Sequence, residues 1–110
     1  MAWTLNNENM KAVGAMSKVE KDLFNDWARA VSNGEHPKSA AEGWDSDYES
    51  YKGAPTKMTI GGKKGSAVKC CSIRLSQGNR VYFVQAESQK MVIVLRVGDH
   101  KEPDWPKEIK

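Results

Sequence analysis

The residues of this sequence with the clearest chemical potential are basic, and they gather in its second half. Residues 1–51 carry five Lys or Arg and nine Asp or Glu, whereas residues 52–110 carry twelve and five. A basic half in a chain whose net charge is only +3 favours a partner with concentrated negative charge, most commonly nucleic acid. A solvated surface is the alternative that charge clustering alone leaves open. The interval between Glu49 and Glu87 holds no acidic residue and contains Lys52, Lys57, Lys63, Lys64, Lys69, Arg74 and Arg80.

The C-terminal tail adds a titratable side chain and an aromatic one. His100 follows an apolar run almost directly, and Trp105 comes five residues later. An imidazole has an ordinary pKa of about 6.5 and can give or take a proton near neutral pH. A tryptophan can stack on a nucleobase or close a hydrophobic core. Pro103 and Pro106 exclude one continuous helix over this tail.

Other reactive groups give no catalytic or metal pattern. Cys70 and Cys71 are the only cysteines, and neighbours on a strand face opposite sides, so we expect two free, partly buried thiols. The turn at 61–65 lacks the spacing of a phosphate loop, and the acidic cluster at 45–49 lacks that of a calcium loop. His36 is expected to be an ordinary loop histidine. We therefore expect no metal and no cofactor.

Length and hydropathy favour one ordinary globular domain over residues 1–110. Of its residues 39% are apolar, which is enough for a core without disulfides. No run of 18 apolar residues is present, so we expect no membrane partner. The N-terminus has no basic segment followed by an apolar one, so we expect a cytoplasmic protein.

A β-meander over residues 66–98 is the element on which the basic residues would be displayed. Its strands are separated by turns at Gly78–Asn79 and at 88–90. The unbroken apolar run Met91–Leu95 predicts that the last strand is the most buried. A short strand over Lys57–Ile60 precedes the meander.

The front half predicts a short edge strand near residues 2–5 and then two antiparallel helices. Met10, Val13 and Met16 share one face of the first, which Gly14 weakens. The second begins with the capping box Ser17-Lys18-Val19-Glu20, runs about 15 residues and ends at Asn33-Gly34. Its apolar stripe steps by four, through Val19, Leu23, Trp27 and Val31.

Residues 35–55 predict mainly loop, with a helical turn near Ser39 and with Trp44, Tyr48 and Tyr51 as anchors. The resulting fold class is α+β: a short N-terminal strand and a helical hairpin packed on an antiparallel C-terminal meander.

Three motifs follow one another in the second half: Cys71-Ser72-Ile73-Arg74-Leu75, then Gly78-Asn79-Arg80-Val81-Tyr82, then the run from Val92 to Lys101 with Val97-Gly98 and His100. Together with the order β-α-α-β-β-β-β, they resemble the RelE/ParE superfamily of bacterial toxins from type II toxin–antitoxin modules. In that family a basic strand precedes a Gly-x-Arg turn, and a hydrophobic strand ends in Val-Gly and basic or His residues. The resemblance covers Ile73 to Lys101 well and the front helices only by order and length.

The resemblance implies a RelE-like fold of the microbial ribonuclease type and one of two activities. RelE-like members are endoribonucleases that cut messenger RNA in the ribosomal A site. ParE-like members poison DNA gyrase and lack the nuclease residues. Either kind implies a cognate antitoxin as partner.

Carried over position by position, the resemblance implies that Arg80 grips the scissile phosphate, that Arg74 is a second basic group and that His100 is a catalytic acid or base. Ser72 stands where a second Lys is common, and no tyrosine follows Tyr82, so the identity of the general base stays open. Substrate binding is assigned to an aromatic in the tail and to the lysines of the basic interval: Lys57, Lys63, Lys64, Lys69 and Trp105.

The leading interpretation is therefore a ribosome-dependent endoribonuclease toxin. RNA can be cut without a metal when the 2′-OH attacks its own phosphate, provided that a base, a positive charge and an acid are in place. A gyrase-poisoning toxin of the same fold and a plain RNA- or protein-binding module are the alternatives.

Overall fold

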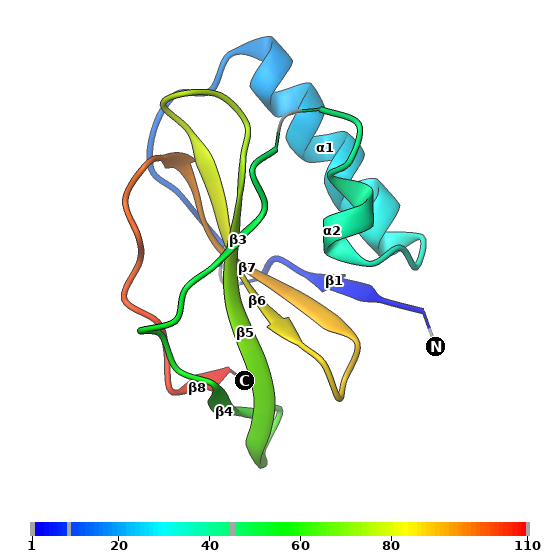
Figure 1. Ribbon diagram of the computed structural model, residues 1–110, viewed down its shortest axis with the longest axis vertical. Helices are drawn as coiled ribbons and strands as arrows, with labels where there is room; N and C mark the ends of the chain where they lie inside the picture. Colours follow the sequence, from blue (N-terminus) through cyan, green and yellow to red (C-terminus); the bar gives the residue numbers. More distant parts are fainter. Residues whose placement is uncertain (1, 9, 45, 110) are drawn as a thin grey trace.

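One curled, mostly antiparallel sheet with helices on one side forms this mixed α+β protein (Figure 1). The computed structural model describes residues 2–8, 10–44 and 46–109. The elements are β1 (Thr4–Asn6), β2 (Lys11–Ala12), α1 (Lys18–Ser32), α2 (Pro37–Ala40), β3 (Glu49–Ser50), β4 (Lys57–Ile60), β5 (Lys63–Arg74), β6 (Arg80–Ala86), β7 (Met91–Asp99) and β8 (Glu108–Ile109). Strands pair in the order β1-β7-β6-β5-β4-β8, with β2 on β7 and β3 on β5.

Helix α1 begins and ends where the sequence predicts. The Ser17 hydroxyl accepts from the Glu20 amide, and the Glu20 carboxylate accepts from the Ser17 amide, which completes the capping box. After 15 residues Asn33 caps the helix, and Gly34 adopts φ +106°, a conformation that favours glycine.

The buried stripe of α1 differs from the predicted one. Val19 is 68% exposed, and the buried positions are Glu20, Phe24, Trp27 and Val31. Each step of four residues turns an α-helix by about 40° beyond a full turn, so three such steps carry Val19 about 120° away from Val31. Steps of four, three and four keep the stripe on one face.

The first predicted helix is wrong, because residues 10–16 are extended. Lys11 and Ala12 form β2, which pairs in parallel with β7, and the Val13 amide donates to the Val97 carbonyl. A Cβ on Gly14 would lie 2.2 Å from the Gly98 oxygen. The segment therefore makes its hydrogen bonds with the edge of β7 instead of within itself, and only glycine permits this approach.

The meander forms as predicted, but its most buried strand is the middle one. All seven residues of β6 are buried, whereas β7 leaves Leu95 and Arg96 only partly covered. β6 lies between the two long strands β5 and β7 and carries a core on each face. The core on the helix side includes Trp27, Phe83 and Val94; the core on the side of the tail includes Met58, Val84, Ile93 and Ile109.

Cys71 and Cys70 lie in these two cores, one on each side of the sheet, and both are free as predicted. Burial raises the pKa of both thiols, that of Cys70 to about 12. Neither group is suited to act as a nucleophile at neutral pH.

The tail crosses the face of the sheet opposite the helices (Figure 1). Its end forms β8, which pairs in parallel with β4, and Trp105 packs against the core on that side. In the described part of the chain, no helix is both long and apolar enough to cross a membrane.

Candidate functional site

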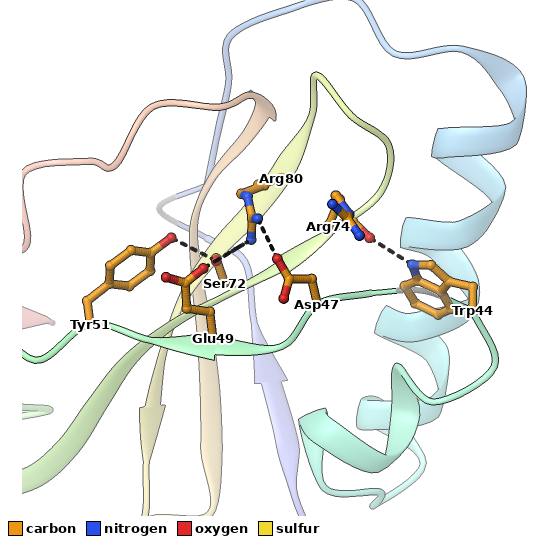
Figure 2. Close-up of polar contacts among 7 residues, drawn as sticks. All are labelled: Trp44, Asp47, Glu49, Tyr51, Ser72, Arg74 and Arg80. Atoms are coloured by element: carbon orange, nitrogen blue, oxygen red, sulfur yellow. Dashed lines mark hydrogen bonds and ion pairs between the residues drawn. The ribbon is translucent and has the colours of Figure 1, made fainter.

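Arg80 lies at the start of β6, and its guanidinium is enclosed by polar partners (Figure 2). Its Nη2 donates to Asp47 at 2.8 Å, and its Nη1 donates to the Ser72 hydroxyl at 3.1 Å and lies 3.7 Å from Glu49. The Arg80 side chain is only 7% exposed, whereas both carboxylates are about half exposed. The site is thus a buried cation covered by two surface anions.

Hydrogen bonding couples Arg80 to this acidic cover. The hydrogen bond from Arg80 holds the pKa of Asp47 below its ordinary value, so this carboxylate is charged throughout the physiological range. The Nε–H of Arg80 is buried and has no hydrogen-bond partner within residues 2–8, 10–44 and 46–109. Asp47 and Glu49 therefore pair with the guanidinium of Arg80 but leave its Nε–H without an acceptor.

An aromatic group borders this cation. Tyr51 hydrogen-bonds the Ser72 hydroxyl at 2.9 Å, and its ring lies 6.1 Å from Tyr82 and 5.9 Å from Trp105. Trp105, which was predicted to stack on a base, is in this structure a partly buried member of the tail-side core. Its ring also lies 6.5 Å from that of Tyr82, which is two residues from Arg80 along β6 and so shares its face of the sheet.

Arg74 is the cross-strand partner of Arg80 at the same end of the meander. Residues directly opposite on paired strands face the same side, so the fold brings the two predicted arginines together. The Arg74 carbonyl accepts from the indole of Trp44 at 2.7 Å, and the Arg74 amide donates to Ser46 (Figure 2). Residues 44 and 46–51 are in this way fastened along β5, next to both arginines.

Glu20 fixes the turn before Arg80. Its carboxylate accepts from the Ser76 hydroxyl and from the Asn79 amide group, besides capping α1. These bonds hold the pKa of Glu20 at about 2, with Ser76 as the largest cause. A helix terminus and the β5–β6 turn are thus joined through one buried carboxylate.

His100 is exposed and follows β7 directly. The last residue of β7, Asp99, is the partner of Arg80 in the β6–β7 ladder. Opposed Cα atoms of antiparallel strands lie about 4.5–5.5 Å apart and consecutive ones 3.8 Å, so the Cα atoms of His100 and Arg80 are within about 9 Å. Two segments that are distant in sequence meet here.

Arg96 is a site residue that sequence reasoning missed. It lies opposite Tyr82, and its Nε and Nη2 donate to the two oxygens of Asp99 at 3.0 and 2.6 Å. No local signal pointed to this pair, because residues three apart on a regular strand face opposite sides, and here Gly98, at φ +112°, lies between them. Arg96 also lines a cavity of about 560 Å³ between β7 and the tail, with Lys11, Leu95, Pro103, Asp104, Pro106, Glu108 and Ile109.

The predicted substrate-binding lysines lie away from Arg80. Lys63 begins β5 and Arg74 ends it, so Lys57, Lys63 and Lys64 are at the opposite end of this 12-residue strand. Lys69 is nearer, but its position differs from that of Arg74 by an odd number of residues, which places it on the other face. These exposed lysines form no common site with the two arginines.

The cluster combines three cations, Arg74, Arg80 and Arg96, with three carboxylates, Asp47, Glu49 and Asp99. Arg80 carries a planar fork of the kind that binds an oxyanion, and in this structure Asp47 and Glu49 lie against it. The backbone of His100 follows the residue opposite Arg80. No protein-family model matches this sequence, and no curated protein matches it.

Proposed function

We propose that this protein is a RelE-like toxin of the RelE/ParE superfamily that cleaves messenger RNA on the ribosome and so inhibits translation. In the proposed reaction the 2′-OH of the RNA attacks the adjacent phosphorus and expels the 5′-oxygen, which leaves a 2′,3′-cyclic phosphate. Arg80 holds the phosphate, Arg74 adds positive charge and His100 transfers a proton.

One observation supports this proposal best: the register of β6 and β7 pairs Arg80 with Asp99, next to His100. The backbones of Arg80 and His100, which belong to different segments, thereby share one end of one sheet. The front of the chain differs from the order that the resemblance implies, since β2 stands in place of the first helix and α1 is the one long helix among the described residues.

Induced expression in bacteria tests the proposal. Wild-type protein is expected to arrest growth and to create new messenger RNA ends, and Arg80→Ala and His100→Ala are expected to lose both effects. Lys101→Ala is the matched control, because Lys101 is exposed and alanine keeps the backbone amide that donates to Asp99. Folding of each variant is checked by urea unfolding. Full cleavage by His100→Ala would refute the assignment.

The burial of Arg80 favours a second candidate, a toxin of the same fold that poisons DNA gyrase. If Asp47 and Glu49 occupy the guanidinium permanently, no phosphate reaches it. Cells that express such a protein would show gyrase-linked DNA breaks and intact messenger RNA, and His100→Ala would stay toxic.

For either kind of toxin, we propose an antitoxin that binds the basic β4–β5 hairpin. The exposed lysines of the β4–β5 hairpin, far from Arg80, suit an acidic segment of such a partner. Co-expression with a candidate antitoxin would restore growth, and Lys63→Glu/Lys64→Glu would weaken the complex without abolishing toxicity.

A further inference from the structure

The donors of Arg80 are only partly used by the acidic side chains that cover them. A carboxylate that fits an arginine fork accepts two parallel N–H groups, but Asp47 accepts one, at 2.8 Å, and Glu49 lies 3.7 Å away. The buried Nε–H stays unpaired among the residues that the structure describes. A buried donor without a partner is costly, so an anion that reached it would be bound more completely.

The two carboxylates can leave without unfolding the segment that carries them. Their side chains are 49% and 50% exposed, so water can solvate them when they leave, whereas Arg80, at 7% exposed, then needs another anion as its partner. The backbone between and beside them is anchored separately, since Tyr48 donates to Gln85 at 2.8 Å and Tyr51 bonds Ser72. Rotation of the Asp47 and Glu49 side chains into water therefore removes both anionic partners of the guanidinium and requires no movement of the backbone (Figure 2).

We propose that Asp47 and Glu49 are resident substitutes for the RNA phosphate, which RNA must displace from Arg80 in order to bind. This inference rests on the proposed function, because it places the scissile phosphodiester at Arg80. A phosphodiester within a longer RNA gains contacts from its flanking nucleotides that offset the displacement, whereas free phosphate does not. The acidic pair thus selects polymeric RNA over small anions.

Substitution of the acidic pair tests this inference. The double variant Asp47→Asn/Glu49→Gln is compared with Asp22→Asn/Glu42→Gln, which changes net charge equally at exposed positions away from Arg80. The probe is a 2′-O-methyl oligoribonucleotide, which binds but cannot be cut. Relative to the control pair, the double variant is expected to bind about three- to tenfold more tightly, because two carboxylates no longer compete with the RNA for Arg80. Affinity equal to that of the control pair, in a folded protein, would overturn the inference.

A measurement on the wild-type chain is independent of how the variant folds. The Asp47 carboxyl is titrated by carbon-13 NMR with and without saturating oligonucleotide. Without RNA, its pKa lies below the ordinary value because Arg80 donates to it. With RNA bound, the pKa is expected to move up toward the ordinary value, and inorganic phosphate at the same concentration is expected to leave it unchanged. An unchanged pKa with bound RNA would refute displacement.

The two proposals fail separately in these experiments. Tighter oligonucleotide binding by the double variant in a protein that never cuts RNA would support the displacement and refute the nuclease. Cleavage by a wild-type protein whose Asp47 stays bound to Arg80 would support the nuclease and refute the displacement.

Discussion

Replacement of Glu20 by Gln removes the carboxylate that joins α1 to the turn before Arg80. Glu20 is 8% exposed and accepts from the Ser17 amide, the Ser76 hydroxyl and the Asn79 amide group. A glutamine keeps one acceptor oxygen but places an NH₂ group against the Asn79 donor. The variant therefore loses two bonds to a charged acceptor and leaves polar groups unpaired.

The pKa of Glu20 sets the magnitude of this loss. A fall from 4.5 to about 2 corresponds to about 3.4 kcal/mol, which screening by nearby solvent reduces to about 2–3 kcal/mol. Because the pKa is depressed in the folded state, this stabilisation is present above about pH 4.5 and is lost as the pH falls toward 2. Glu20→Gln is expected to be about 2–3 kcal/mol less stable at pH 7 and to lose less stability on acidification.

Urea unfolding followed by tryptophan fluorescence, at pH 7 and at pH 3, measures both effects. Glu42→Gln, at an exposed position, is the control and is expected to change the free energy of unfolding by less than about 0.5 kcal/mol. A Glu20→Gln variant as stable as this control, or with the same acid dependence as wild type, would refute the network as a source of stability.

Two further substitutions test the fold around the site. Gly14→Ala should destabilise the protein by about 1–3 kcal/mol, because its Cβ would lie 2.2 Å from the Gly98 oxygen. The control Gly43→Ala, whose Cβ would have nothing within 4 Å, should leave the stability nearly unchanged. Equal unfolding midpoints for the two variants would contradict the close approach of Gly14 to Gly98. His36 accepts from the Lys38 amide, and burial lowers its pKa, so the wild type should lose stability as the pH falls below about 6.5. His36→Asn keeps a capping oxygen and should remove that loss, as unfolding at pH 7.5 and 5 would reveal; an unchanged difference would exclude His36 as its source.

Elements with strong local signals were predictable from the sequence. The capping box and Gly34 predicted where α1 begins and ends, and β-branched residues and turn residues predicted the strands of the meander. The 10–16 segment was not predictable, because a helical spacing of Met10, Val13 and Met16 is overridden by pairing with β7, eighty residues away. No local pattern reports such a long-range partner.

Two of the three arginines of the candidate site, Arg74 and Arg80, were predictable from the sequence, but Arg96 and the anions were not. The motif around Arg74 and Arg80 identified two residues that the fold places opposite each other. Asp47 and Glu49 belong to a segment with weak local signal, and their contact with Arg80 spans more than thirty residues. The charge pattern also grouped lysines of the β4–β5 hairpin with Arg80, although the length of β5 separates them.

Cleavage in a purified translation system tests the proposed nuclease most directly. Ribosomes programmed with a defined messenger RNA are incubated with wild-type protein or with His100→Ala, and the RNA ends are mapped. The account predicts ribosome-dependent cuts that leave 2′,3′-cyclic phosphates, and a rate at least about 100-fold lower for His100→Ala, the usual effect of removing a general acid or base. Intact messenger RNA with the wild-type protein, or an equal rate with His100→Ala, would contradict it.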